Sequence, residues 1–257
     1  RRTKYGVEGQ YADGRRRLIT TAGYRVHLDD GTDVDTDFED TPEPQWVARG
    51  KSLPFRLLVG NGANRRITPR PEVPGEYLEI GRPEWDNGGW TDIPFTGWSY
   101  DQNVFTVDGP GYQAGIVVLP EKILTTITWD TQGHDFRFEL SPVGLTYDDS
   151  DRVFVSDSDG QPVLWLGVSR WEDAEGTVGE FDGVWDGTYL TYTPDLSGAV
   201  FPVTIDPDVS VEVDGYYSGG YAGSDSSFAY ATLYVGQAES GGVVFNSFLR
   251  FVIVSPL

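Results

Sequence analysis

Residues 153–168 read VFVSDSDGQPVLWLGV, with an apolar run on each side of Asp159-Gly160. An Asp-Gly pair between apolar segments is a strong local signal for the tight turn of a β-hairpin. Residues 184–194, VWDGTYLTYTP, repeat this arrangement around Asp186-Gly187. Both stretches predict antiparallel hairpins, and with them a fold built from strands.

The rest of the chain has the same character. Most apolar runs are short and bounded by Gly, Pro, Asp or Asn, and the 257 residues include 32 Gly and 16 Pro. Long stripes with the 3.6-residue period of an amphipathic helix are absent. The sequence therefore predicts an all-β fold of antiparallel β-sandwich modules in tandem, with little helix. The expected strands lie at residues 15–21, 23–28, 55–60, 76–80, 90–95, 103–107, 113–119, 123–129, 135–140, 143–147, 152–156, 162–168, 188–193 and 200–205.

Composition argues against several classes of function. The formal net charge of −21 disfavours nucleic acid as a partner, because a phosphate backbone attracts a basic surface. No apolar run approaches the roughly 20 residues that span a bilayer, so no membrane span is expected. The lack of Cys excludes a disulfide framework, a thiolate metal site and a catalytic thiol. The lack of Met indicates that the chain does not begin where translation began.

The end of the chain resembles a known domain. Residues 214–251 read DGYYSGGYAGSDSSFAYATLYVGQAESGGVVFNSFLRF. The order of an Asp opening, the ATLYVG strand, a Gly-rich turn and SFLRF resembles the start of the DNRLRE, or disaggregatase-related, domain. This resemblance implies an all-β sandwich of secreted, cell-surface and viral proteins, some of which bind acidic polysaccharides. Residues 207–257 are therefore expected to be the incomplete start of a DNRLRE-like sandwich.

Earlier stretches are similar to large RHS-like and phage structural proteins. The similarity lies in residues 1–39, in residues 56–83 with NRRITP and GEYLEIGRP, and in FPVTIDP at residues 201–207. It implies three parts: an N-terminal β segment at 1–83, a β-sandwich module at 84–206, and the DNRLRE-like start at 207–257.

No set of catalytic residues stands out in the sequence. The two histidines, His27 and His134, are far apart in the chain, which argues against a zinc site. Residues 97–101, GWSYD, lack the second Gly of a nucleophile elbow. Paired carboxylates of a glycosidase would be sought among the acids that lie between aromatic residues, namely Glu84, Asp86, Asp92 and Asp101. Polysaccharide degradation is thus a second alternative, and no catalytic residue is assigned.

Aromatic residues are concentrated in residues 84–101, EWDNGGWTDIPFTGWSYD. Sugar rings stack on exposed Trp and Tyr side chains, while carboxylates and amides bind the hydroxyls. The same rings would also serve as inward-facing core residues of a sandwich, and large aromatic side chains are mostly interior. Both interpretations stay open for the candidate carbohydrate-binding residues, which are Trp85, Trp90, Trp98, Tyr100, Tyr216 and Tyr217.

Alternating aspartates suggest calcium as a cofactor. On an extended strand, Asp33, Asp35 and Asp37 would point to the same side, and carboxylate oxygens are the ligands that Ca²⁺ prefers. The spacing is not that of an EF-hand. Further clusters lie at residues 148–151 and 157–159. Capping of turns by Asp side chains is the alternative for all of them.

Charge is distributed unevenly at the N-terminal end. Residues 1–28 are basic and include Arg15, Arg16 and Arg17, whereas residues 29–43 contain eight acids and no cation. The two segments are complementary, so the three arginines are candidate contacts in an assembly. Solvated strands and a loop are the alternative.

Taken together, these features predict a non-enzymatic extracellular structural or assembly protein. The expected role is that of a virion component (tail, fibre or capsid-attached) or of a cell-surface shell protein, with other copies or neighbouring structural proteins as partners. A carbohydrate-binding adhesin module, with polysaccharide as its partner, is the alternative.

Overall fold

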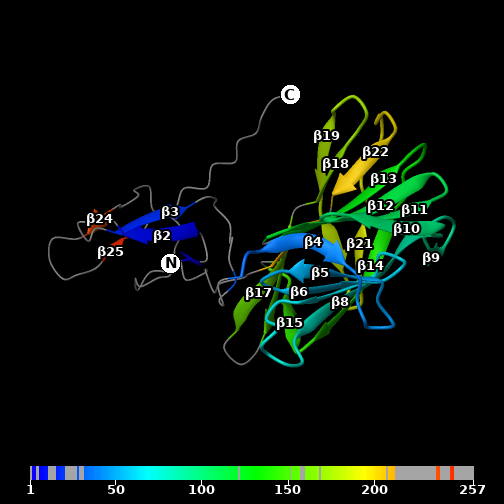
Figure 1. Cartoon of the computed structure of the whole chain (residues 1–257). Helices are drawn as coiled ribbons and strands as arrows, with labels where there is room; N and C mark the ends of the chain where they lie inside the picture. Colours follow the sequence, from blue (N-terminus) through cyan, green and yellow to red (C-terminus); the bar gives the residue numbers. More distant parts are fainter. Residues whose placement is uncertain are drawn as a thin grey trace. The chain divides into compact units, whose positions relative to one another are not determined.

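The computed structural model describes the backbone of residues 2–3, 6–10, 16–20, 28, 32–120, 122–150, 152–156, 160–167, 169–206, 208–211, 236–237 and 244–245. Side chains are described at residue 28 and from 32 to 206, with gaps at 121, 151, 156–159, 161 and 168. Strands dominate these residues and no helix occurs among them, which confirms the predicted all-β fold (Figure 1). The chain forms two compact units, residues 1–215 and 216–257.

A nine-stranded antiparallel sheet forms one layer of the first unit. Its strand order is β20-β21-β14-β8-β7-β6-β5-β4, and β9 pairs with β8. The strands are β4 (Asp35–Glu39), β5 (Ala48–Ser52), β6 (Arg56–Val59), β7 (Arg65–Thr68), β8 (Tyr77–Asp86), β9 (Trp90–Asp92), β14 (Phe136–Val143), β20 (Gly183–Trp185) and β21 (Tyr189–Tyr192). Because β8 is continuous, the segment boundary expected after residue 83 falls inside a strand.

An eleven-stranded antiparallel sheet forms the second layer. Its main order is β10-β11-β12-β13-β23-β17-β16-β15, with β22 beside β13 and β18, and β19 beside β18. The strands are β10 (Gly97–Asp101), β11 (Val104–Gly109), β12 (Tyr112–Leu119), β13 (Lys122–Trp129), β15 (Leu145–Asp148), β16 (Val153–Ser156), β17 (Gln161–Leu166), β18 (Ser169–Glu172), β19 (Val178–Phe181), β22 (Val203–Asp206) and β23 (Asp208–Val211).

Two small sheets are described by their backbone alone. One contains β1 (Arg2–Thr3), β2 (Gly6–Gln10) and β3 (Arg16–Thr20), in that order. The other pairs β24 (Gly236–Gln237) with β25 (Val244–Phe245).

Both predicted hairpins are confirmed. β16 pairs antiparallel with β17, and Gly160 before β17 has a φ of 63°. β20 pairs antiparallel with β21 across Asp186 and Gly187. In that turn the Asp186 carboxylate accepts hydrogen bonds from the backbone N–H groups of Thr188 (2.9 Å) and Tyr189 (2.8 Å), and Gly187 has a φ of 100°.

Strand prediction from apolar runs missed several elements. Most expected strands are present with shifted ends, whereas the expected strand at 23–28 lies outside the described residues except for Leu28. The strands without an expected counterpart are β1, β2, β4, β5, β7, β10, β18, β19, β23 and β25. In β5 and β7 charged side chains fill so many positions that no apolar run marks the strand.

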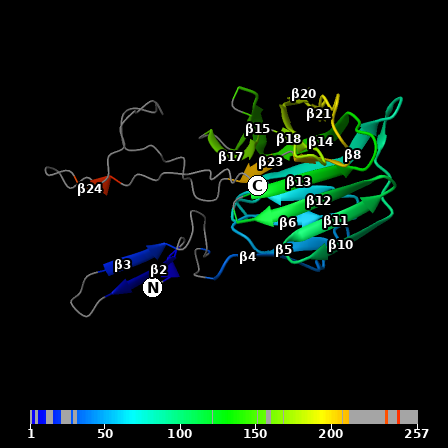
Figure 2. The same cartoon turned by 90° about the horizontal axis from the view of Figure 1, so that it is seen from above.

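The two sheets pack face to face around one hydrophobic core (Figures 1 and 2). Alternation along the strands supplies it: in β13 every second side chain is buried, including Ile127 and Trp129. Across the layers, the ring of Trp85 on β8 stacks on that of Trp129, with centroids 5.6 Å apart and planes 13° from parallel. Burial of such rings is the main stabilising contribution to a fold of this kind.

The ends of the main strand orders of the two sheets meet, β4 with β10 and β20 with β15, and β19 is a further edge of the eleven-stranded sheet. At one side, the backbone N–H of Phe38 on β4 donates to the carbonyl of Gln102, which follows β10, over 2.7 Å. At the other side, Trp185 on β20 packs edge-on against Tyr147 on β15, with ring centroids 4.4 Å apart. Edge strands expose unpaired backbone groups. The approach of the edges at both sides therefore brings the sandwich close to a flattened barrel.

The eleven-stranded sheet divides at β13. Residues Ile127–Trp129 of β13 pair with β22, and Lys122–Leu124 pair with β23 in the same register. On its other side β22 pairs with β18, and β23 likewise pairs with β17. Figure 1 shows the two branches separating, with β18 and β19 at the top of the view and β15 and β17 at the bottom. Thr125 and Thr126 lie where the pairing passes from one branch to the other.

Candidate functional site

Among the residues with described side chains, an exposed Trp and a half-buried Tyr lie at the edge where β4 meets β10. Trp98 and Tyr100 are two positions apart on β10, so their side chains share one face of the strand. Their rings are within 10° of parallel, with centroids 6.5 Å apart. We call this pair the aromatic strip. Trp98 is 41% exposed, the only aromatic side chain among the large exposed hydrophobic ones of the described residues.

The aromatic strip packs against aromatic residues of the core. Trp98 stacks on the buried ring of Phe105, at 5.7 Å and 11°, and Tyr100 packs against Phe38. The strip thus continues the inward face of the sheet, but β10 is the last strand and leaves its inward rings partly uncovered. The aromatic residues of 84–101 can therefore include both core and surface side chains.

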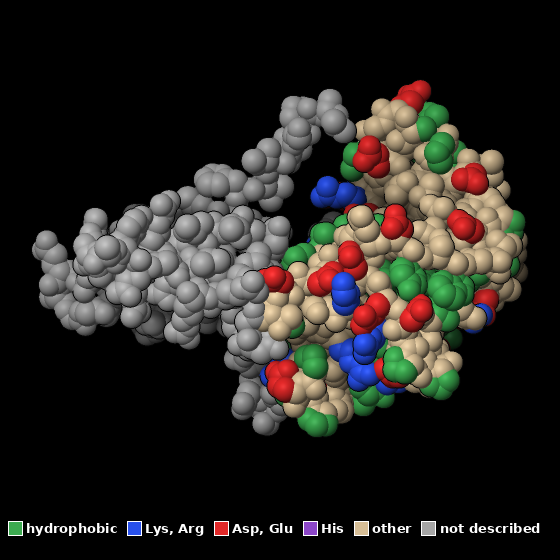
Figure 3. Space-filling model, in the orientation of Figure 1, with side chains coloured by type: hydrophobic (Ala, Val, Ile, Leu, Met, Phe, Trp, Pro, Cys, Tyr) green, Lys and Arg blue, Asp and Glu red, His purple; other side chains and the backbone are tan. Residues whose placement is uncertain are grey.

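An acidic side chain fixes the orientation of Tyr100. The Tyr100 hydroxyl donates a 2.8 Å hydrogen bond to Oδ1 of Asp40, which follows β4. This bond raises the pKa of Tyr100, because it stabilises the protonated hydroxyl. Figure 3 shows hydrophobic side chains beside acidic ones on the side of the sandwich that carries β4 and β10. Rings with adjacent carboxylates are the groups that contact sugar faces and hydroxyls.

The other two described aromatic candidates lie elsewhere. Trp85 turns into the core, where it also contacts Tyr112, and its indole N–H donates to Thr91 Oγ1 over 3.1 Å. The guanidinium of Arg137 lies over the rings of Trp90, at 4.4 Å, and of Tyr189, at 3.7 Å. The structure therefore separates Trp85 and Trp90 from the aromatic strip.

The acids of the same stretch have separate environments. Glu84 forms an ion pair with Arg137 over 2.6 Å and lies opposite Asp92 in the β8–β9 pair. Asp86 accepts the backbone N–H of Gly89 in the turn between these strands. Asp101 belongs to β10 in the other sheet.

The alternating aspartates are described from residue 33 onward. Asp35 forms an ion pair with Lys51 over 2.6 Å, and this contact lowers the pKa of Asp35. Its Oδ1 also accepts the backbone N–H of Asp37. Among the residues with described side chains, no group of three or more His, Cys, Asp or Glu side chains is placed to hold a metal ion. Calcium binding by Asp33, Asp35 and Asp37 stays a prediction.

Several candidates fall outside the described side chains. They are Arg15, Arg16, Arg17, Tyr216 and Tyr217; the backbone of Arg16 and Arg17 belongs to β3. Of the other aspartate clusters, Asp148 caps a turn by accepting the N–H of Ser150 over 2.9 Å.

One residue with unusual chemistry was missed from the sequence. Arg65 on β7 is 2% exposed and has no acidic partner among the described residues. Burial lowers its pKa to about 10, since a low-dielectric surrounding disfavours the charged form. The alternation of Arg65 with the buried Ile67 could have placed Arg65 inside, had β7 been recognised as a strand.

Most of the shifted pKa values are explained by backbone hydrogen bonds or by burial. Backbone N–H groups lower the pKa of Asp173 and Asp186, and burial raises that of Tyr112 and Tyr192. In active sites such shifts converge in a cleft. These four groups lie at separate turns and core positions of the described residues, and of them Tyr192 lies near another perturbed group, Arg65.

Comparison with protein-family models, with curated proteins and with solved structures gave no match. The resemblances to RHS-like, phage structural and DNRLRE proteins therefore remain predictions. The described residues contain no helix with the length and hydrophobicity required to cross a membrane.

Proposed function

We propose that this chain is a non-enzymatic structural or assembly protein of an extracellular particle, either a virion (tail, fibre or capsid-attached) or a cell-surface layer. The observation that carries the proposal is the two-layer sandwich whose edges meet at both sides over one core. Such a closed scaffold suits a component that must keep its shape in a particle. The perturbed pKa values arise from backbone hydrogen bonds in turns, as for Asp173, and from burial in the core, as for Tyr192. These causes support a role without catalysis.

The outward face of the nine-stranded sheet adds a second argument. Several of its cations are paired with acids of neighbouring strands, as in Arg49–Glu39 and Arg66–Glu79, whereas Arg82 on β8 donates to the amide oxygen of Asn61; Figure 3 shows acidic and basic side chains interleaved. With a net charge of −21, copies repel one another at long range. Assembly must therefore use apolar contacts or cations that are not already paired. We assign the cationic side of the proposed contact to Arg15, Arg16 and Arg17 of the basic segment.

Fractionation tests the structural role. A culture that produces the protein is separated into cytoplasm, cell surface and released particles, and the protein is located with an antibody. We expect it in the particle or surface fraction. Recovery in the cytoplasm alone would contradict the proposal.

Ionic strength tests the assembly contact. Arg15/Arg16/Arg17→Ser should weaken association more at low salt than at high salt, because salt already screens charge attraction in the unmodified chain. Sedimentation velocity at several salt concentrations measures this. Equal association of variant and wild type at every concentration would remove the three arginines from the contact.

The aromatic strip supports a second candidate function, carbohydrate binding. Its exposed Trp98 ring, with the Tyr100–Asp40 pair beside it, provides a stacking surface and a carboxylate. Affinity electrophoresis in gels that contain neutral or anionic polysaccharides tests it. Trp98→Ala should abolish retardation, whereas Trp90→Ala should not, because the Arg137 guanidinium lies over the Trp90 ring. Retention of both variants equal to wild type would exclude the aromatic strip as the site.

A further inference from the structure

Arg65 brings a positive charge into the sandwich core. β7 alternates Arg65 and Ile67 on its buried face with Arg66 and Thr68 on the other. The guanidinium stays protonated at neutral pH even with its lowered pKa of about 10. A buried charge without a counter-charge is strongly destabilising, so the position calls for a compensating group.

The protein itself compensates this charge only in part. Nη2 donates to Thr125 Oγ1 over 2.6 Å, and Nη1 makes a long bond of 3.4 Å to the carbonyl of Ala63. Nε is buried without a partner among the described residues. The guanidinium also lies 5.6 Å from the centre of the Phe138 ring. All these contacts are with neutral groups, and none of the described acids pairs with Arg65.

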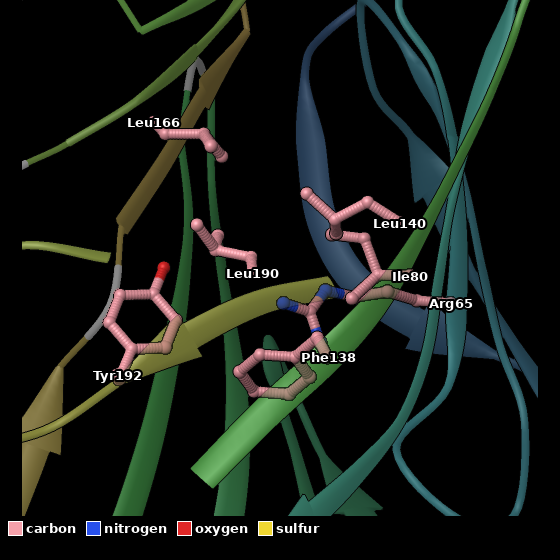
Figure 4. Close-up of a pocket in the computed structure, with 7 residues that line it drawn as sticks. All are labelled: Arg65, Ile80, Phe138, Leu140, Leu166, Leu190 and Tyr192. Carbon is pink, nitrogen blue, oxygen red and sulfur yellow. The ribbon is translucent and has the colours of Figure 1, made fainter. Parts of the chain in front are cut away.

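A small cavity lies beside the guanidinium. Figure 4 shows Arg65 entering the space between Phe138, Leu190 and Tyr192. The space has room for about one water-sized particle. Two lining residues carry polar groups, Arg65 and Tyr192. The other lining residues are apolar: Ile80, Phe138, Leu140, Leu166 and Leu190.

The branched sheet accounts for the position of this cavity. Thr125, the partner of Arg65, lies on β13 between the residues that pair with β22 and those that pair with β23. Leu166 ends β17, one of the two branches. The Arg65 side chain extends from β7 to the part of β13 where the pairing passes from one branch to the other.

We propose that this cavity binds a single small inorganic anion, chloride in ordinary media, which neutralises Arg65. The size admits one monatomic ion and excludes the carboxylate of a larger ligand. Arg65 Nε is an N–H donor without a partner among the described residues, and the Thr125 hydroxyl, which accepts from Nη2, keeps its own proton to donate. An apolar lining suits a weakly hydrated halide better than a strongly hydrated anion.

The first test measures thermal unfolding at constant ionic strength, with sodium gluconate exchanged stepwise for sodium chloride. Binding to the folded state alone should raise the wild-type midpoint by about 3–5 °C for each tenfold rise in chloride above Kd. Arg65→Met removes the charge and should not respond to chloride. Arg66→Met is the matched control on the outward face and should respond like wild type. An unresponsive wild type, or an Arg65→Met variant that responds equally, would overturn the proposal.

The second test needs no variant that might fail to fold. Wild-type crystals grown or soaked in sodium bromide are examined for anomalous scattering at the bromine edge. We expect one bromide within about 3.5 Å of the Arg65 guanidinium. Density without an anomalous signal at this position would identify a water molecule and would rule out the anion.

Discussion

Aspartate side chains close several turns of the sandwich through backbone hydrogen bonds. The largest set belongs to Asp173, between β18 and β19. Its Oδ1 accepts the N–H groups of Glu175 and Thr177, and its Oδ2 accepts that of Val200 over 3.0 Å. A single carboxylate thus fixes its own turn and ties it to the loop before β22. The Val200 bond is the foremost cause of the lowered pKa of Asp173.

This pKa predicts a dependence on acid. The folded value lies below the ordinary 3.8, so the carboxylate stabilises the fold fully above about pH 4 and loses this effect as the pH falls through the folded value. Asp173→Ala should lower the unfolding midpoint at pH 7, and the gap to wild type should narrow below pH 4. Thermal unfolding from pH 7 to pH 2 measures this. Glu175→Ala, in the same turn, is the control, and an equal loss in both variants would contradict the assignment.

Glycine at the β20–β21 turn gives a prediction about backbone conformation. Gly187 has a φ of 100°, and an added Cβ would meet no atom within 4 Å. Gly187→Ala should therefore destabilise by about 1–2 kcal/mol through backbone strain alone. Gly97 has equally open surroundings without a positive φ, so Gly97→Ala should be neutral or slightly stabilising. Urea unfolding distinguishes the two, and equal effects would contradict the strain argument.

Among the elements, β8 and β10 each carry a Trp, one in the core and one at the surface. Trp85 on β8 links the layers through Trp129 and Tyr112, whereas Trp98 on β10 remains 41% exposed. Trp85→Ala should cost about 3 kcal/mol of unfolding free energy. Trp98→Ala should cost less than half of that, because less of its surface is buried. Urea unfolding of both variants tests this, and a larger loss for Trp98→Ala would contradict the assignment of Trp85 to the core.

Local sequence predicts strands where apolar residues alternate, and the hairpin turns where Asp-Gly follows them. It could not predict that Trp98 would be exposed, because exposure depends on β10 being the last strand of its sheet, and strand order is a property of the whole fold. β5 and β7 were missed for another reason. Their buried positions include Ala48 and Arg65, which do not mark an inward face.

For the whole molecule, the net charge of −21 predicts an effect of salt. Repulsion between like charges disfavours the compact state, and exposed ion pairs contribute little each. Raising sodium gluconate from 10 to 150 mM shortens the screening length from about 30 to about 8 Å and should raise the unfolding midpoint. Gluconate screens without supplying a small anion, so this effect is separate from chloride binding at Arg65. A falling midpoint would show that ion pairs outweigh repulsion.

The place of β23 in the branched sheet also determines how the sandwich responds to tension. β23 is hydrogen-bonded on both sides, to β13 and to β17, whereas β4 pairs with β5 on one side and has one backbone bond, to Gln102 after β10, on the other. A pull on the chain after Val211 loads two ladders at once, and a pull before Asp35 loads one. In a stretched molecule we therefore expect β4 to separate from its sheet first, while β23 stays paired with β13 and β17.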